Sequence, residues 1–135
     1  MKIVIDTNVV ASAIFFGGRP RDLIEKLMLH DLTAYVSQEI VEEYQNTVQR
    51  LKDKFPGKKV TIPLTQIVSA CLLIEPATDI KVCRDPDDDK FIECAMNSKS
   101  VYIVSGDHDL LVLEKYHDIE IITVAEFFRR YEEHH

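Results

Sequence analysis

Residues 2–8 of the chain read KIVIDTN, a short run of mainly β-branched apolar residues followed at once by polar ones. The run at 2–5 is typical of a buried strand, and the polar residues 6–8 predict a loop directly after it. A second strand of this kind is predicted at 101–104, again with polar residues behind it. We therefore expect two buried strands whose carboxyl ends both lead into polar loops.

Between and beyond these strands, helical and strand-like patterns alternate. Pro20 opens one helical pattern, and Ser37 is a suitable N-cap for another, which the sequence FPG at 55–57 ends. The alternation favours an α/β fold, a three-layer α/β/α arrangement with a mostly parallel central sheet. The further predicted strands are 33–36, 120–123 and, more weakly, 80–82. The predicted helices are 20–30, 38–54, 63–74, a segment capped by Asp87, Asp88 or Asp89 that carries Phe91 to Met96, 110–114 and 124–131.

The chain is long enough for one domain with its own core. It has 135 residues, and a chain of this size buries roughly 68% of the surface that it exposes when unfolded. No repeat or linker divides it, so we expect a single domain over residues 1–133. The final His134 and His135 are either native or the remnant of a purification tag.

The cysteines and the apolar stretches bear on the compartment. The three cysteines are an odd number at no metal-ligand spacing, as expected of small buried side chains in a reducing cytoplasm. No apolar stretch approaches the ~20 residues needed to cross a bilayer, and Asp6 interrupts the apolar start before a signal sequence forms. We expect a cytoplasmic protein without a membrane segment.

The charge balance limits which nucleic-acid proteins fit. Lys and Arg number 16 against 23 Asp and Glu, a formal net charge of −7. A protein that coats nucleic acid needs an excess of cations to release counterions from the phosphates, so that class is disfavoured. A nuclease is not excluded, because acidic residues gathered at one point hold metal ions that themselves meet the phosphate.

Acidic residues stand where the predicted strands end. Asp6 follows the first strand, Asp89 opens a helix after an acidic loop, and Asp107 follows the strand at 101–104. In an open parallel sheet, ligands bind at the carboxyl ends of the strands, so we expect these three carboxylates to converge. Each alone is also typical of a turn or a helix cap, and only their conjunction points to a site.

The helix predicted at 38–54 supplies a fourth carboxylate. At about 100° per residue, Glu43 lies about 60° outside the apolar stripe that contains Ile40 and Tyr44, whereas Glu42 lies opposite that stripe. A carboxylate at the border of a buried face is able to point into a crevice. Glu43 is therefore favoured over Glu42, with a solvated helix residue as the alternative.

Crowded carboxylates favour a bound cation. Like charges a few ångströms apart raise one another's pKa, and a divalent ion removes this penalty. Hard oxygen ligands suit Mg²⁺ or Mn²⁺, which activate water and stabilise the leaving oxygen in phosphodiester hydrolysis. No Ser-His-Asp or Cys-His arrangement supports a covalent alternative. The acidic residues therefore predict a metal-dependent nuclease.

Four stretches are specific when taken together and in this order. They are IVIDTNVVASAIF at 3–15, SQEIVEEY at 37–44, DPDDDKFIECA at 85–95 and YIVSGDHDLL at 102–111. With them the chain resembles the PIN-domain ribonucleases, the fold of many toxin components of VapBC-type toxin–antitoxin pairs, over nearly its whole length. The resemblance implies a PIN-like fold.

The resemblance also implies roles for particular residues. It makes Asp6, Glu43, Asp89 and Asp107 the catalytic, metal-binding acidic tetrad. Asp89 is preferred over Asp88 because it stands at the family's spacing before Ile92 and Ala95. The residues that would support the site are Asn8, Ser105, Asp88 and Asp109, with Asp85 close enough to assist.

The activity that the resemblance implies is cleavage of RNA phosphodiester bonds with Mg²⁺ or Mn²⁺. It further implies a toxin role opposite an antitoxin protein, and a homodimer. Cations that would contact the RNA phosphates are Arg19, Arg21, Lys52 and Lys54. The last two belong to a basic stretch at 50–59, for which a solvated helix end is the alternative interpretation. Phe15, Phe16 and Phe55 are candidates for base stacking, with core packing as the alternative.

Two other classes of function compete with this interpretation. One is a PIN-like protein that binds a partner without significant catalysis. The other is a phosphotransferase with a nucleophilic Asp, as in haloacid-dehalogenase-like proteins, or a receiver-type domain. The phosphotransferase pattern needs an Asp where this chain has Asn8, and Glu43 has no role in a receiver.

Overall fold

The computed structural model describes residues 1–134, and its centre is a six-stranded sheet. The strands are β1 (Lys2–Ile5), β2 (Thr33–Val36), β3 (Leu72–Leu73), β4 (Tyr102–Val104), β5 (Lys115–Tyr116) and β6 (Ile119–Ile122). Their order is β3-β2-β1-β4-β6-β5, and all neighbours are parallel except β5 and β6, which are antiparallel. The predicted α/β fold with a mostly parallel central sheet is confirmed.

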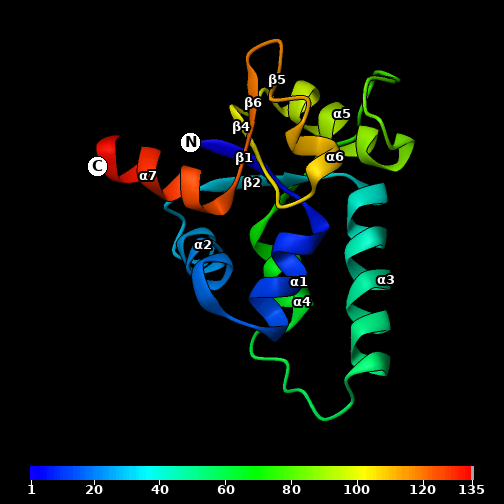
Figure 1. Cartoon of the computed structure of the whole chain (residues 1–135), viewed down its shortest axis with the longest axis vertical. Helices are drawn as coiled ribbons and strands as arrows, with labels where there is room; N and C mark the ends of the chain where they lie inside the picture. The colour runs from blue at the N-terminus through cyan, green and yellow to red at the C-terminus, as the bar shows by residue number, and fades with distance from the viewer. Residues whose placement is uncertain (135) are drawn as a thin grey trace.

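Helices flank this sheet. They are α1 (Thr7–Phe15), α2 (Gly18–Met28), α3 (Gln38–Lys54), α4 (Leu64–Ala70), the 3₁₀ turn η1 (Pro86–Asp88), α5 (Asp89–Ser98), α6 (His108–Leu111) and α7 (Val124–His134). In Figure 1, α1, α2 and α4 lie below the strands, α3 stands along the right side, and α5 and α6 lie to the right of β4 and β6. Within residues 1–134, every helix is too short or too polar to span a lipid bilayer.

The middle of the sheet forms the core. Ile3, Val4, Ile103 and Val104 are fully buried, as expected of strands covered on both faces. The helix α5 packs on β1, β2 and β4, while α1 packs against α2 and α3. The two strands predicted at the outset therefore lie side by side at the centre, where the register pairs Ile5 with Val104.

The main difference from the prediction follows directly after β1. Residues 6–8 were expected to form a loop, but α1 begins at Thr7, with Asp6 as its N-cap. Most of α1 is buried, including Val9, Ala13 and Ile14. A helix that is apolar all round has no amphipathic period, so the pattern that identifies surface helices does not identify this one.

Smaller differences occur at short elements. The helix predicted at 63–74 ends at Ala70 and gives way to the edge strand β3, and the weak strand at 80–82 does not form. The helix predicted at 110–114 is α6, which begins earlier because Asp107 caps it by accepting a hydrogen bond from the Asp109 amide. Both β3 and β5 have two residues, too few for the alternation that predicts a strand.

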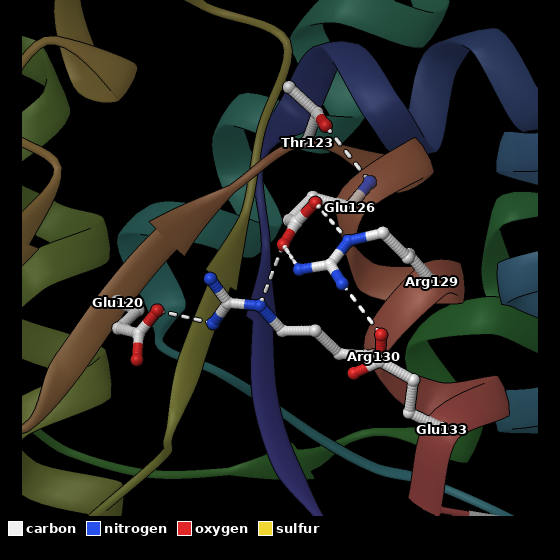
Figure 2. A network of polar contacts seen from close by, with 6 residues as sticks. All are labelled: Glu120, Thr123, Glu126, Arg129, Arg130 and Glu133. Atoms are coloured by element: carbon white, nitrogen blue, oxygen red, sulfur yellow. Dashed lines mark hydrogen bonds and ion pairs between the residues drawn. The ribbon is translucent and has the colours of Figure 1, made fainter.

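A polar network fixes the last helix to the sheet. Figure 2 shows Glu126 accepting hydrogen bonds from Arg129 and Arg130, both at 2.9 Å. Arg130 also pairs with Glu120 of β6, and its guanidinium lies 5.5 Å from the centre of the Tyr102 ring on β4. The two arginines lower the pKa of Glu126 to about 2. Residue 135 lies outside the described part, so the interpretation of the two final histidines stays a prediction.

Candidate metal centre

The first two acidic residues meet because β1 and β4 are neighbours. Asp6 follows β1 and Ser105 follows β4, and the Ser105 hydroxyl donates a hydrogen bond of 2.7 Å to Oδ2 of Asp6. The backbone amide of Asp107 donates to the same hydroxyl oxygen at 2.9 Å. Ser105 is fully buried and Asp6 is 3% exposed. Ser105 therefore holds the Asp6 carboxylate and the backbone of Asp107 in a fixed relation.

Glu43 comes from the first half of α3. Ser37 caps this helix by accepting a hydrogen bond from the Ile40 amide, and the buried Tyr44 hydroxyl donates to the carbonyl of Ile5. The contact between Tyr44 and Ile5 brings the helix to the end of β1. As the wheel predicts, Glu43 is half-buried while Glu42 is exposed.

Both oxygens of the Glu43 carboxylate have partners. The Thr7 hydroxyl at the start of α1 donates a hydrogen bond to Oε2. Nζ of Lys90, on α5, lies 2.9 Å from Oε1, and both members of this ion pair are largely shielded from solvent. Three helices therefore meet at this one carboxylate.

A cavity of about 370 Å³ opens at this edge of the sheet. Asp6, Glu43 and Asp107 line it, and so does Asn8. Asp88, and not Asp89, completes the group of carboxylates in the cavity. The remaining lining residues are Thr7, Asn46, Thr47, Arg50, Asp85 and Asp87.

Asp89, predicted as the fourth member of the tetrad, is engaged elsewhere. Its Oδ1 accepts hydrogen bonds from the backbone amides of Val82 and Cys83, at 3.1 and 2.8 Å. The structure thus places Asp89 under the loop before η1, and Asp88 faces the cavity in its stead. The reason is the 3₁₀ turn at Pro86–Asp88, which rotates the acidic run before α5 begins. Spacing to Ile92 within α5 carries no information about this turn.

Burial and mutual repulsion raise the pKa of two of these carboxyls. The pKa of Asp6 rises to about 6, chiefly through burial, with Asp107 and Glu43 adding to the effect and the Ser105 hydrogen bond opposing it. The pKa of Asp88 rises to about 7 through burial and the charges of Asp107, Asp6 and Asp85. A bound cation would reverse both effects, because it stabilises the ionised form.

The residues present fit a hard divalent ion. Oδ2 of Asp88 is buried and has no hydrogen-bond partner among the described residues. Ligand oxygens of Asp85, Asp88 and Asp109 lie within 4.8 Å of one another, although Asp109 also lies 3.6 Å from Arg84. Carboxylate oxygens are the ligands that Mg²⁺ and Mn²⁺ prefer. Asp88, like Asp85, therefore belongs both to the cavity lining and to this group of three acids.

The predicted RNA-contacting cations lie outside the cavity lining. Arg19 stacks on Phe128 at 4.5 Å and pairs with Glu132, both on α7, while Arg21 pairs with Glu25 along α2. Lys52 and Lys54 are exposed at the end of α3. Arg50 is the basic residue that lines the cavity. The sequence pattern placed it only within the basic stretch at 50–59 and gave it no role of its own.

Sequence reasoning also missed Thr7 and Lys90 as partners of Glu43. Thr7 directly follows Asp6, and this position next to the end of the first predicted strand was the available signal for a side chain near the site. Lys90 directly follows the acidic run, and a lysine beside several carboxylates indicates an ion-pair partner for one of the acids of the site.

Comparison with known proteins agrees with this geometry. The family model of the PIN domain matches residues 2–109, a range that contains every carboxylate that lines the cavity. Uncharacterized protein MJ1680 of Methanocaldococcus jannaschii is 35% identical over 145 aligned positions, which cover 98% of this chain and 92% of that protein. The chain therefore belongs to the PIN domain family, whose fold is that of nucleases.

Proposed function

We propose that this protein is a metal-dependent endoribonuclease that hydrolyses RNA phosphodiester bonds. The observation that carries the proposal is the meeting of four carboxylates from four separate segments in one cavity: Asp6, Glu43, Asp88 and Asp107. Structural ion pairs would place a cation opposite each acid, as Lys90 does for Glu43, whereas Asp6 and Asp88 have raised pKa values and repel their neighbours. Such an arrangement is stabilised by a ligand with positive charge.

The proposed ligands of Mg²⁺ or Mn²⁺ are Asp6, Asp88 and Asp107, with Glu43 at the border of the cavity. Asp88 takes the place that the sequence suggested for Asp89. When bound, the ion supplies charge neutralisation for the phosphate and lowers the pKa of water. Ser105 orients Asp6, and Thr7 orients Glu43, so that these carboxylates keep their positions without the ion. Asp85 and Asp109 are proposed as assisting groups beside Asp88.

The cavity supports this function over the phosphotransferase and receiver alternatives. A phosphotransferase of the haloacid-dehalogenase type needs a second acid where Asn8 stands. A receiver has no role for a helical carboxylate such as Glu43, which here lines the cavity and has partners on both oxygens. A partner-binding protein without catalysis stays as the competing proposal.

The resemblance to VapBC-type toxins extends the proposal to the biological role. We propose a cytoplasmic toxin that acts as a homodimer and is inhibited by an antitoxin protein. Expression of the wild-type chain should then arrest growth, and Asp6→Asn should not. Growth unaffected by an active wild-type enzyme would remove the toxin role and leave the ribonuclease in place.

The experiment that tests the activity uses a labelled pool of RNAs and the purified protein. We expect cleavage with Mg²⁺ or Mn²⁺, none with EDTA, and products with 5′-phosphate and 3′-hydroxyl ends. Asp6→Asn and Glu43→Gln should abolish cleavage and leave the fold intact. Glu42→Gln is the matched control, because Glu42 is the exposed neighbour of Glu43 and should keep full activity. Absence of cleavage by the folded wild type with either metal would favour partner binding.

A further inference from the structure

The far ends of α1 and α3 carry an exposed patch of aromatic and basic side chains. Phe16 is 60% exposed and Phe55 is 40% exposed. Nζ of Lys58 lies 4.3 Å from the centre of the Phe16 ring, and Nζ of Lys54 lies 5.5 Å from the centre of the Phe55 ring. Exposed large aromatic rings of this kind mark binding surfaces when they gather in one place.

The chain geometry brings the two rings into one patch. The amide of Lys58 donates to the carbonyl of Phe55 at 3.0 Å, so the turn at 55–58 carries both Phe55 and the lysine that covers Phe16. Thr61 donates two hydrogen bonds to the carbonyl of Ile14, one from its amide and one from its hydroxyl. The loop after α3 is thereby fastened to the last turn of α1.

A basic stripe connects this patch to the carboxylate cavity. Arg50 lies seven residues after Glu43, and Lys54 lies four residues after Arg50, spacings that return to the same face of a helix. Arg50 lines the cavity itself. Lys52 lies nine residues after Glu43, about 180° around the helix, and so faces away. From Glu43 to Lys54 the helix rises about 16 Å, which sets the length of the stripe.

The surface defined by Arg50, Lys54, Phe55, Lys58 and Phe16 is called the α3 strip below. We propose that the α3 strip binds single-stranded RNA and leads it into the cavity, an inference that rests on the proposed ribonuclease function. Its cations stand in a chain with a net charge of −7, so the concentration of positive charge here is local. Phosphates fit the cations, and unpaired bases fit the two rings.

Single-stranded RNA is the occupant because the rings need bases that are free to unstack. In a duplex the bases are paired and their faces are hidden, whereas a single strand offers each base to an aromatic platform. The ammonium of Lys58, now over the Phe16 ring, would then move to a phosphate while a base takes its place on the ring. Continuity with the cavity through Arg50 makes the strip part of a substrate path.

The test measures binding of a labelled single-stranded RNA of about 12 nucleotides in EDTA, so that no cleavage occurs. Phe16→Ala should raise the Kd about fivefold or more, since stacking on one aromatic ring contributes that much, and Phe16→Tyr should restore binding. Arg50→Ala and Lys54→Ala should each reduce the slope of log K against log salt by about 0.7. Lys52→Ala, with the same charge change on the opposite face, should leave Kd and slope unchanged.

Other outcomes would overturn the proposal. Equal binding by all variants would do so, as would an equal loss in Lys52→Ala and Lys54→Ala. Equal competition by double-stranded RNA or by polyglutamate would show that the strip recognises charge alone, in nucleic acid or in an acidic protein. Cleavage with Mn²⁺, assayed separately on the wild type, tests the proposed function: a protein that binds RNA through the strip but does not cut it loses the ribonuclease function and keeps the strip.

Discussion

Asp88 and Asp89 are adjacent in the chain, yet their carboxylates have different surroundings. Asp88 lines a cavity together with five other acids, and its Oδ2 lies buried without a hydrogen-bond partner in the described residues. Asp89 is equally buried, but it accepts two backbone hydrogen bonds. One carboxylate is therefore suited to a cation and the other to holding a loop.

Substitutions of Asp88 and Asp89 should have different effects on cleavage, Mn²⁺ binding and stability. Asp88→Asn is expected to lower the rate of cleavage at least about 100-fold, the upper end of what loss of a group supporting a metal ligand costs, and to weaken Mn²⁺ binding. Asp89→Ala should keep Mn²⁺ binding but lose about 1–3 kcal/mol of stability, because the partly buried amides of Val82 and Cys83 lose their charged acceptor. Calorimetric titration with Mn²⁺ and thermal unfolding distinguish the effects. Loss of Mn²⁺ binding in a folded Asp89→Ala, with binding kept in Asp88→Asn, would reverse the assignment.

Three of the carboxylates in the candidate site could be predicted from the sequence. Asp6 and Asp107 follow strands that any periodicity analysis finds, and Glu43 emerges from the helical wheel because α3 is long and amphipathic. The choice between Asp88 and Asp89 was not accessible. It depends on a 3₁₀ turn of three residues, and helical spacing cannot fix which of two adjacent carboxylates turns inward.

At the scale of elements, the ion pair between Glu43 and Lys90 joins α3 to α5 beside the cavity. Lys90 occupies one oxygen of a carboxylate whose other oxygen accepts from Thr7. A cation that binds Glu43 must therefore compete with an ammonium group. The pair keeps the two helices together when the cavity holds no other positive charge.

Lys90→Met should consequently tighten Mn²⁺ binding and lower the free energy of unfolding of the metal-free protein. The expected decrease in Kd is about threefold to fivefold, matching the modest worth of a partly exposed ion pair. Lys52→Met is the control, since it removes the same charge from the outer face of α3 and should leave the Kd unchanged. Weaker Mn²⁺ binding by Lys90→Met would instead mean that Lys90 positions Glu43 for the ion.

The same scale explains which elements escape sequence analysis. Apolar runs predict the strands β1, β2 and β4, and an amphipathic period predicts the helix α3. Neither pattern predicts the helix α1, because it is buried on nearly all sides and the polar residues 6–8 around its start are typical of a loop. The strands β3 and β5 exist through pairing with β2 and β6, and nothing within their two residues predicts that pairing.

At the scale of the whole molecule, charge is segregated along α3. Its beginning faces the carboxylate cavity, and its end carries the α3 strip, although the net charge of the chain is −7. Without a cation the cavity concentrates repulsion among buried acids. The stability of the whole domain should therefore respond to pH and to metal through this one region.

Without metal, the free energy of unfolding should fall as the pH rises from about 4 to 7. Unfolded Asp titrates near 3.8, whereas folded Asp6 keeps its proton to about pH 6 and Asp88 to about pH 7. The folded state thus binds more protons in this window, and deprotonation costs stability, about 3 kcal/mol for Asp6. Thermal unfolding in EDTA across this range measures the loss. Asp6→Asn should flatten the curve, and an unchanged slope in that variant would contradict the assignment.

Metal should restore what the rise in pH removes. At a Mn²⁺ concentration about 100 times the Kd, binding adds about 2.7 kcal/mol, which corresponds to about 10 °C in Tm for a domain of this size. At one fixed Mn²⁺ concentration, the gain should be larger at pH 8 than at pH 5, because protons compete with the ion for the same carboxylates and raise the Kd at low pH. Glu42→Gln should respond like the wild type and Glu43→Gln less. An equal gain in Tm at both pH values would mean that the ion is not bound by these acids.

The hydrogen bond from Ser105 to Asp6 also has a consequence for the timing of synthesis. It joins residues 99 positions apart, and Asp88 and Asp107 likewise enter long after Asp6 has been made. A nascent chain on the ribosome therefore holds Asp6 and Glu43 without the groups that complete the cavity. With the proposed ribonuclease function, the message that encodes the protein and the ribosomal RNA around the exit tunnel would be spared until β4 has paired with β1 and the segment after β4 has emerged.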